Sequence, residues 1–261
     1  MVNIIAVCNQ KGGVAKTTTA VNLAASLAVR KKSVLLMDLD PQGNATMGCG
    51  IDKHQLANSS LEVCLNRCSL ADAALKTEFT KLSIVPANQD LTVAEVKMRE
   101  LDNAPFILRQ QLKTFTQTCK TDFMIIDCPP ALNILTVNAM AAARHLVVPI
   151  QCEYYALEGL TALLDTVSDL QKGANKQLQI LGFLRTMFDG RAKLANEVSA
   201  QLETFLQDKV FQTVIPRNIR LAEAPSYGMP AYYYDKSSKG AKAYYAFAKE
   251  VMQRLKRQST S

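Results

Sequence analysis

Two lysines and two threonines stand close together near the start of the chain, in a glycine-containing turn. Residues 10–18 read Gln-Lys-Gly-Gly-Val-Ala-Lys-Thr-Thr, directly after the apolar run Ile4–Cys8 and at the start of the breaker-free stretch Thr17–Val29. Glycines let backbone amides curl around an anion, and a helix N-terminus adds further amides and a positive dipole end. Lys16 is expected to reach the β- and γ-phosphates of a nucleotide, and the Thr17 hydroxyl to hold Mg²⁺. The segment therefore predicts a nucleoside triphosphate site, with ATP as the expected nucleotide.

The loop departs from the usual phosphate-loop pattern at two positions. In G-x-x-x-x-G-K-[ST], the two glycines correspond here to Gln10 and Ala15. The pattern alone leaves a second interpretation open, in which a glycine-containing turn merely starts a helix and the lysine is incidental. Carboxylates further along the chain favour the nucleotide site.

Two apolar runs end in these carboxylates. Leu35–Met37 leads into Asp38 and then Asp40, and Met124–Ile126 leads into Asp127. Ligands of open α/β sheets bind at the carboxyl ends of the strands. An apolar strand that ends in Asp is also the Walker-B arrangement, whose carboxylate lies near the Mg²⁺ shell. One such Asp is usually an ordinary loop residue, but three polar segments after three strands predict one shared site.

Apolar runs of strand length alternate with stretches of helical periodicity. Several runs are continuous, which is typical of parallel strands covered on both faces. The alternation indicates βαβ units with right-handed crossovers. The predicted fold class is therefore α/β: a single-domain P-loop NTPase fold with a mostly parallel twisted sheet and helices on both faces. The expected strands are Ile4–Cys8, Val34–Met37, Leu82–Val85, Phe123–Ile126, Leu146–Ile150, Ile180–Leu184 and Val210–Ile215, and the expected helices are Thr17–Val29, Ala156–Leu170, Lys193–Leu206 and Ala241–Leu255.

No Pro/Ser-rich linker or internal repeat divides the chain, so one domain is expected over residues 1–255. Asn58–Asp102 is the least regular region and is interpreted as short helices around one strand. The polar end, residues 256–261, is predicted to fray.

The composition is that of a soluble globular protein, with 48% hydrophobic and 20% charged residues. No apolar run reaches the roughly 18 residues that span a bilayer, and the N-terminus has no signal-like segment. A cytoplasmic protein is therefore expected. The seven irregularly spaced cysteines indicate reduced, mostly buried thiols. Cys64 and Cys68 could share a helix face, but no second ligand pair follows them, which disfavours a metal site.

The net charge of +7 is concentrated in the C-terminal third. Residues 185–261 carry 13 Lys+Arg and 7 Asp+Glu, a balance of +6, which leaves 17 against 16, or +1, for residues 1–184. A solvated face would explain the surplus, and so would an anionic partner such as DNA or a membrane surface.

The loop and four other segments resemble the ParA/Soj/MinD superfamily of ATPases. Lys11–Thr18 has a second lysine at its start and looks like the deviant Walker A motif K-G-G-x-G-K-[ST]. Asp38–Thr46 is similar to the family's switch I, and Ile125–Pro130 to its switch II. Tyr154–Leu160 and Ile215–Gly228 resemble segments typical of the ParA/Soj branch. The resemblance runs from about residue 1 to residue 255.

The resemblance implies a chromosome- or plasmid-partitioning ATPase. In that family ATP and Mg²⁺ drive a sandwich homodimer with two nucleotides between the subunits. The dimer binds double-stranded DNA without sequence preference, and a ParB-type partner protein stimulates hydrolysis and releases it. A nucleoid-associated, cytoplasmic protein with slow basal hydrolysis and no membrane partner is the corresponding expectation.

Each matching position carries an implied role. Lys11 corresponds to the signature lysine that crosses to the phosphates of the other subunit, where a second cation stabilises developing charge as an arginine finger does. Gly12 lies where two subunits approach closely. Asp40 positions or activates the attacking water, so the implied catalytic residues are Lys11, Lys16 and Asp40, and the implied Mg²⁺ residues are Thr17, Asp38 and Asp127. The implied nucleotide-binding residues are Lys11, Gly12, Gly13, Val14, Ala15, Lys16, Thr17 and Thr18, with Met187, Pro216 and Asn218 at the adenine.

Ala15 departs from the family pattern, which usually has glycine there. If the position needs a positive φ, alanine costs about 1 kcal/mol of strain; if it needs only a small side chain, the change is nearly neutral. The departure bears on nucleotide affinity and turnover more than on the existence of the site.

The basic C-terminal third gains an interpretation from the resemblance. Its cations would contact DNA phosphates in a dimer, and nothing in the pattern indicates base readout. The predicted DNA-contacting residues are Arg191, Arg217, Arg220, Lys236, Lys239 and Lys242.

Three other functions stay open on the sequence. A MinD-like, membrane-associated ATPase would need a C-terminal amphipathic helix with a large apolar face. An iron–sulfur reductase subunit would need cysteines that bridge two subunits. A non-hydrolysing nucleotide switch would follow if Ala15 disabled catalysis.

Overall fold

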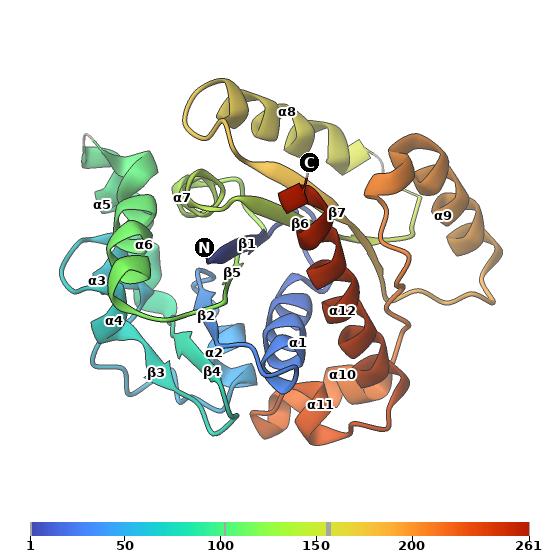
Figure 1. Cartoon of the computed structure of the whole chain (residues 1–261), viewed down its shortest axis with the longest axis horizontal. Helices are drawn as coiled ribbons and strands as arrows, with labels where there is room; N and C mark the ends of the chain where they lie inside the picture. Colours follow the sequence, from blue (N-terminus) through green and yellow to red (C-terminus); the bar gives the residue numbers. More distant parts are fainter. Residues whose placement is uncertain (1, 102, 155–157, 261) are drawn as a thin grey trace.

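The protein is built on one seven-stranded sheet with helices on both faces, seen in a computed structural model that describes residues 2–101, 103–154 and 158–260 (Figure 1). The strand order is β3-β4-β2-β5-β1-β6-β7. All pairings are parallel except that of β3 with β4. The strands are β1 (Asn3–Val7), β2 (Val34–Asp38), β3 (Leu75–Lys76), β4 (Leu82–Val85), β5 (Phe123–Asp127), β6 (His145–Gln151) and β7 (Gln179–Thr186).

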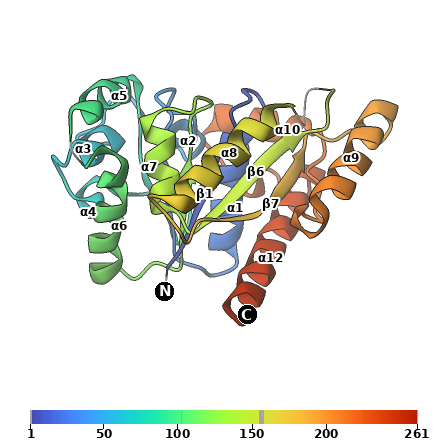
Figure 2. The same cartoon turned by 90° about the horizontal axis from the view of Figure 1, so that it is seen from above.

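Helices cover the two faces of this sheet (Figures 1 and 2). One buried cluster lies beneath α1 and α12, and a second lies beneath α6, α7 and α8. The central strands β1, β2 and β5 are buried on both sides, which explains their continuous apolar runs. The helices are α1 (Lys16–Val29), α2 (Asn44–Gly48), α3 (Ser60–Cys64), α4 (Leu70–Ala73), α5 (Thr92–Lys97), α6 (Ile107–Thr118), α7 (Ile134–Ala142), α8 (Glu158–Lys172), α9 (Lys193–Leu206), α10 (Ile219–Glu223), α11 (Ala231–Tyr234) and α12 (Lys239–Thr260).

The predicted α/β class with a mostly parallel sheet is confirmed, and the structure differs from the sequence expectations in three places. Residues 58–102 contain two strands, since the two-residue β3 pairs with β4. Helix α12 continues to Thr260, across most of the tail that was predicted to fray. The start of the predicted helix Ala156–Leu170 lies outside the described residues, and α8 is described from Glu158.

The remaining difference is that the sequence wrongly predicts a strand over Val210–Ile215. Phe211 and Ile215 do donate backbone hydrogen bonds to carbonyls of β7. The amides of Gln212 and Thr213 donate instead to the Glu250 carboxylate on α12, at 2.8 and 2.9 Å. These two bonds interrupt the backbone hydrogen bonding between residues 210–215 and β7. An isolated β-bridge between Val210 and Phe183 is left.

Candidate functional site

The sheet brings the three predicted polar segments to one place. Strand β5 lies between β1 and β2, and Asp127 is in register with Val7 on one side and Asp38 on the other. The loop of residues 10–18 follows β1 at the same carboxyl edge and leads into α1. The phosphate loop and the two aspartates therefore converge at the position where open α/β sheets bind ligands.

The loop adopts a conformation that alanine tolerates poorly. Gly13 has φ +73°, and Ala15 lies in the left-handed region at φ 63° and ψ 37°. A left-handed alanine costs about 1 kcal/mol relative to glycine, so the Ala15 substitution carries strain. Val14 is buried, and its carbonyl accepts a hydrogen bond from the Thr186 hydroxyl at 3.0 Å. This bond attaches the loop to the end of β7, the edge strand of the sheet.

Lys16 is a buried cation at the first residue of α1. Its side chain is only 7% exposed, and its Nζ donates to the Lys11 carbonyl at 3.0 Å, within the loop itself. Burial lowers the pKa of Lys16, while the charges of Asp127 and Asp40 act in the opposite direction. A bound phosphate would supply the counter-charge that the loop's backbone does not.

Asp127 is fully buried at the end of β5, and among the described residues neither of its carboxylate oxygens accepts a hydrogen bond of normal geometry. Burial is the main cause that raises the pKa of Asp127 well above its usual range, and the charge of Asp38 adds to it. The approach of the Thr17 hydroxyl and the charge of Lys16 lower that pKa in part. A buried carboxylate with so few hydrogen-bond partners fits a cation, and Thr17 beside it supplies a second oxygen, so the residues present fit Mg²⁺.

Asp38 is also buried, but its oxygens already have partners. Oδ2 accepts from the Thr46 amide at 2.9 Å and the Thr46 hydroxyl at 2.8 Å, and Oδ1 accepts from the Asp40 amide at 3.1 Å. Burial raises the pKa of Asp38 to about 6 against the lowering effect of these bonds. Asp38 thus holds the switch I segment in place, and Thr46 is a positioning residue that the sequence reasoning did not single out.

Asp40 and Lys11 lie on the loops that follow β2 and β1. Asp40 is 8% exposed, and its carboxylate accepts a hydrogen bond from the Gln42 amide at 2.9 Å. Lys11 is half-exposed, and its Nζ lies 2.8 Å from Glu153, which follows β6. Sequence reasoning missed Glu153, because the chain gives no signal for a pair 142 positions apart. Apart from Gly12 and its two chain neighbours, no heavy atom of the described residues lies within 4 Å of the position that a Cβ on Gly12 would occupy, so the loop is open on this side.

The predicted adenine residues lie together beyond the end of β7. Met187 follows the strand with φ 49°, and Pro216 forms a bridge with the neighbouring Phe188. Asn218 precedes α10, and its buried Oδ1 accepts no hydrogen bond from the part of the chain that the structure describes. A buried acceptor without a donor is uncommon in proteins and fits a ligand amine. Their contact with a nucleotide base stays a prediction.

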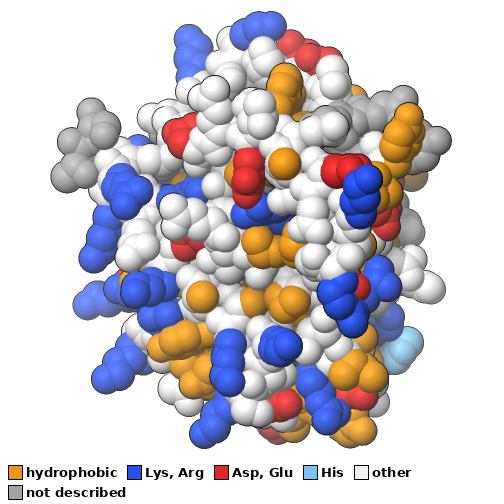
Figure 3. Space-filling view, turned by 90° about the vertical axis from the view of Figure 1, so that its right-hand side faces the viewer, with side chains coloured by type: hydrophobic (Ala, Val, Ile, Leu, Met, Phe, Trp, Pro, Cys, Tyr) orange, Lys and Arg blue, Asp and Glu red, His pale blue; other side chains and the backbone are white. Residues whose placement is uncertain are grey.

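The six predicted DNA-contacting residues divide into two kinds. Arg191 pairs with Asp189, and Arg220 pairs with Glu223 and Asp235. The others are exposed, and none of them has an ion pair within the part of the chain that the structure describes: Arg217, Lys236, Lys239 and Lys242. Figure 3 shows Lys and Arg side chains spread over the face on the α9 and α12 side, with hydrophobic patches between them.

The cysteines and the C-terminal helix bear on the alternatives. All seven cysteines are free thiols, and the closest contact joins the buried Sγ atoms of Cys8 and Cys128 at 2.7 Å. Within the described ranges, no three Cys, His, Asp or Glu side chains gather around a possible metal position. No described helix is long and apolar enough to cross a bilayer. The apolar side of α12 packs on the protein body through Tyr244, Phe247, Val251 and Leu255.

Comparison with known proteins gives consistent matches over nearly the whole chain. A family model described as an AAA domain matches residues 2–180. The chromosome partitioning protein ParA of Myxococcus xanthus is 46% identical over 251 residues, which cover 96% of this chain and 88% of that one. The sporulation initiation inhibitor protein Soj of Bacillus subtilis is 46% identical over 251 residues, covering 96% and 98%. The crystal structure of cobyrinic acid a,c-diamide synthase from Mycobacterium smegmatis, with bound ATP analogue and magnesium, is 36% identical with a TM-score of 0.85, covering 98% and 96%.

Proposed function

The chain belongs to the ParA/Soj family of partitioning ATPases, and from this premise we propose that it hydrolyses ATP to move or position DNA. The observation that carries the proposal is the buried pair of opposite charges at the carboxyl edge. Among the described residues, the hydrogen bond that the Lys16 ammonium makes is to a backbone carbonyl, and the Asp127 carboxylate accepts none of normal geometry. A nucleotide phosphate and its Mg²⁺ supply what each of them lacks.

The loop residues bind and orient the nucleotide. Lys16 leaves the Lys11 carbonyl and pairs with the β- and γ-phosphates, while the amides of Gly13 to Thr18 surround them. Thr17 and Asp127 would hold Mg²⁺, which neutralises phosphate charge when bound. Asp40 follows β2 at the carboxyl ends of the strands, beside the phosphate loop, where its carboxylate would orient the attacking water.

Lys11 is the residue that extends the site beyond one subunit. It is half-exposed on the surface and held by one ion pair with Glu153. Exposed pairs contribute about 0–1 kcal/mol, so Lys11 can exchange Glu153 for a phosphate of a second copy at little cost. The open space around Gly12 lets that copy approach the loop closely. ATP therefore favours a sandwich homodimer.

The dimer provides the DNA-binding state. Each copy contributes a basic face on the α9 and α12 side, and non-specific sites of this kind have dissociation constants of about 10⁻⁴–10⁻⁶ M. Two linked faces gain affinity by avidity, so ATP switches DNA binding on. A ParB-type partner then speeds the slow basal hydrolysis and returns the protein to the DNA-free form.

DNA retention tests this function directly. The purified protein is passed over immobilised non-specific duplex DNA with ATP, ADP or no nucleotide, at several salt concentrations, while phosphate release is followed. We expect retention with ATP alone, weakening steeply with salt, together with slow phosphate release. Retention that does not depend on nucleotide would contradict the switch. Binding to anionic liposomes in place of DNA would favour the membrane-associated alternative, and DNA retention without phosphate release would favour a non-hydrolysing switch.

A further inference from the structure

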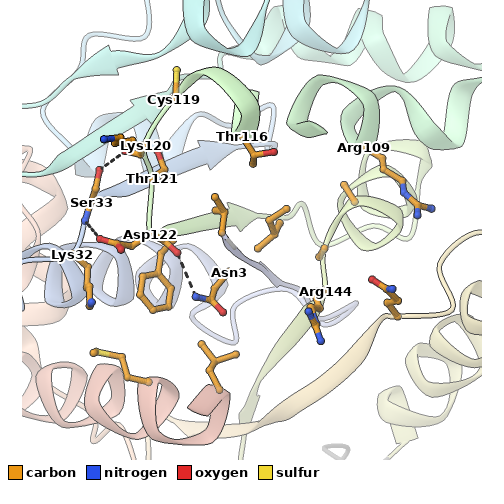
Figure 4. Close-up of a pocket in the computed structure, with 18 of the residues that line it drawn as sticks. Asn3, Lys32, Ser33, Arg109, Thr116, Cys119, Lys120, Thr121, Asp122 and Arg144 are labelled. Carbon is orange, nitrogen blue, oxygen red and sulfur yellow. Dashed lines mark hydrogen bonds between the residues drawn. The ribbon is translucent and has the colours of Figure 1, made fainter. Parts of the chain in front are cut away.

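A cavity lies at the amino ends of the strands, at the opposite end of the sheet from the phosphate loop. It encloses about 790 Å³, within the range of small-ligand pockets. Its walls come from the starts of β1 and β5 and from the segments that follow α1, α6, α7 and α8, with α12 along one side (Figure 4). None of the residues assigned to the nucleotide site or the DNA-binding face lines it.

The lining of this cavity is strongly basic. Its charged residues are Lys32, Arg109, Lys120, Arg144, Lys256 and Asp122. Five cations against one carboxylate give a formal balance of +5 − 1 = +4, out of a net charge of +7 for the whole chain. More than half of the protein's net charge therefore surrounds one cavity that the proposed function does not use.

Helix dipoles account for only part of this charge. The helices α1, α6, α7, α8 and α12 end near the cavity, and each helix C-terminus is equivalent to about −0.5 charge. Five such ends amount to about −2.5, which is less than the formal surplus of +4. The basic side chains therefore exceed what the helix ends offset, so helix capping alone does not explain the composition of the wall.

The charged side chains of the cavity differ in whether they already have hydrogen-bond or ion-pair partners. The Asp122 carboxylate accepts from the Ser33 amide at 2.8 Å, and Arg109 donates to the Ala174 carbonyl at 2.9 Å. The structure gives the ammonium groups of Lys32 and Lys120 no hydrogen bond or ion pair among the residues it describes. Figure 4 shows these two lysines on one side of the cavity and Arg109 with Arg144 on the other.

We propose that this cavity binds a small polyanion, a molecule with two or more phosphate or carboxylate groups. Cations on both sides of the cavity suit anionic groups at the two ends of such a molecule. The lining also includes apolar side chains, among them Phe123, Met252 and Leu255, which would contact a neutral part of the ligand. The guanidinium groups match phosphate and carboxylate equally well, since both offer paired oxygens.

Calorimetric titration with inorganic pyrophosphate and, separately, with citrate tests this site. The protein used is Lys16→Ala without Mg²⁺, because that substitution removes the lysine of the phosphate loop. We expect saturable binding of one or both probes. Charge reversal in Lys32→Glu/Lys120→Glu should weaken it by about tenfold or more, equivalent to at least about 1.4 kcal/mol. Pyrophosphate binding alone would narrow the class to phosphates, and citrate binding alone to carboxylates.

A matched control separates the cavity from general surface charge. Lys76→Glu/Lys97→Glu changes the net charge by the same amount at exposed positions outside the cavity. This variant should keep the probe affinity within about twofold of the parent protein. Absence of binding by either probe, or an equal loss in the two double variants, would overturn the proposal. If Lys32→Glu/Lys120→Glu does not fold, Lys32→Ala/Lys120→Ala provides the same comparison. The outcome is independent of DNA binding and hydrolysis.

Discussion

The phosphate site and the basic C-terminal face both use positive charge, but they hold it in opposite ways. Lys16 is buried beside buried carboxylates, and Asp127 accepts no hydrogen bond of normal geometry from the residues that the structure describes. Arg217 and the lysines of α12 are exposed, where water and salt screen their charge. A buried charge that loses its partner is costly, whereas an exposed one contributes little by itself. Substitutions at the phosphate site should therefore abolish ATP binding or hydrolysis, whereas substitutions on the basic face should weaken DNA binding by degrees that depend on salt.

The largest effect is expected from Lys16→Ala. Loss of a buried ammonium–phosphate contact costs about 3 kcal/mol, which corresponds to about a hundredfold weaker ATP binding. Titration with a fluorescent ATP analogue measures it, with Lys97→Ala on the exposed surface of α5 as the control. Undiminished ATP affinity in Lys16→Ala would show that this loop does not bind the phosphates of ATP.

Asp127→Asn is expected to abolish Mg²⁺-dependent hydrolysis while stabilising the nucleotide-free fold. The pKa of Asp127 is raised in the folded protein, so the folded state holds more protons than the unfolded state above the carboxyl's ordinary pKa. Wild-type stability should therefore fall as the pH rises from about 4 towards neutrality, and this contribution should be missing in Asp127→Asn. Urea unfolding of both proteins at several pH values measures the difference. Equal pH dependence would show that Asp127 is not a buried, uncompensated carboxylate.

On the basic face, Arg217→Glu should weaken DNA retention more than Arg191→Glu. Arg217 has no ion pair among the described residues, whereas Arg191 already pairs with Asp189. We expect about a tenfold loss for Arg217→Glu and about twofold for Arg191→Glu, with a shallower salt dependence for the former. ATP binding should be unchanged in both. Reversing Arg220 together with Arg217 should add little, because Arg220 pairs with Glu223 and Asp235. Equal retention of all variants would place the DNA-binding surface elsewhere.

Glu153→Gln is expected to favour the dimer modestly, because it releases Lys11. An exposed pair of this kind is worth up to about 1 kcal/mol, or about fivefold in the dimerisation constant with ATP. Analytical ultracentrifugation with ATP measures the change. Glu197→Gln, which removes the exposed Lys193–Glu197 pair of α9, is the matched control and should have no effect. Weaker dimerisation in Glu153→Gln would mean that Glu153 supports the interface instead of restraining Lys11.

The smallest effect is expected from Ala15→Gly. Relief of the left-handed strain of Ala15 should stabilise the folded state by about 1 kcal/mol. Glycine also raises the conformational entropy of the unfolded chain, which lowers the free energy of unfolding by about 0.4–1 kcal/mol. The free energy of unfolding should therefore rise by no more than about 0.5 kcal/mol. A loss of more than about 1 kcal/mol in urea unfolding would contradict the strained conformation of Ala15.

The sequence predicted the parts of the molecule that local patterns determine. Continuous apolar runs predicted the central strands, and the Asp residues that end two of them marked the carboxyl edge. Features set by distant partners could not be predicted. The capture of the Gln212 and Thr213 amides by Glu250 prevents a strand that hydrophobicity favours. The Lys11–Glu153 pair and the bonds from Thr46 to Asp38 likewise depend on how loops meet in three dimensions.

We propose that ATP completes the site with a second subunit through Lys11. Size-exclusion chromatography with light scattering on Asp40→Ala, which should bind ATP without hydrolysing it, measures this directly. We predict a dimer with ATP, a monomer with ADP, and a monomer in both nucleotides when Lys11→Ala is added. A monomeric Asp40→Ala protein in ATP, or a dimer that persists in Lys11→Ala/Asp40→Ala, would rule out this role of Lys11.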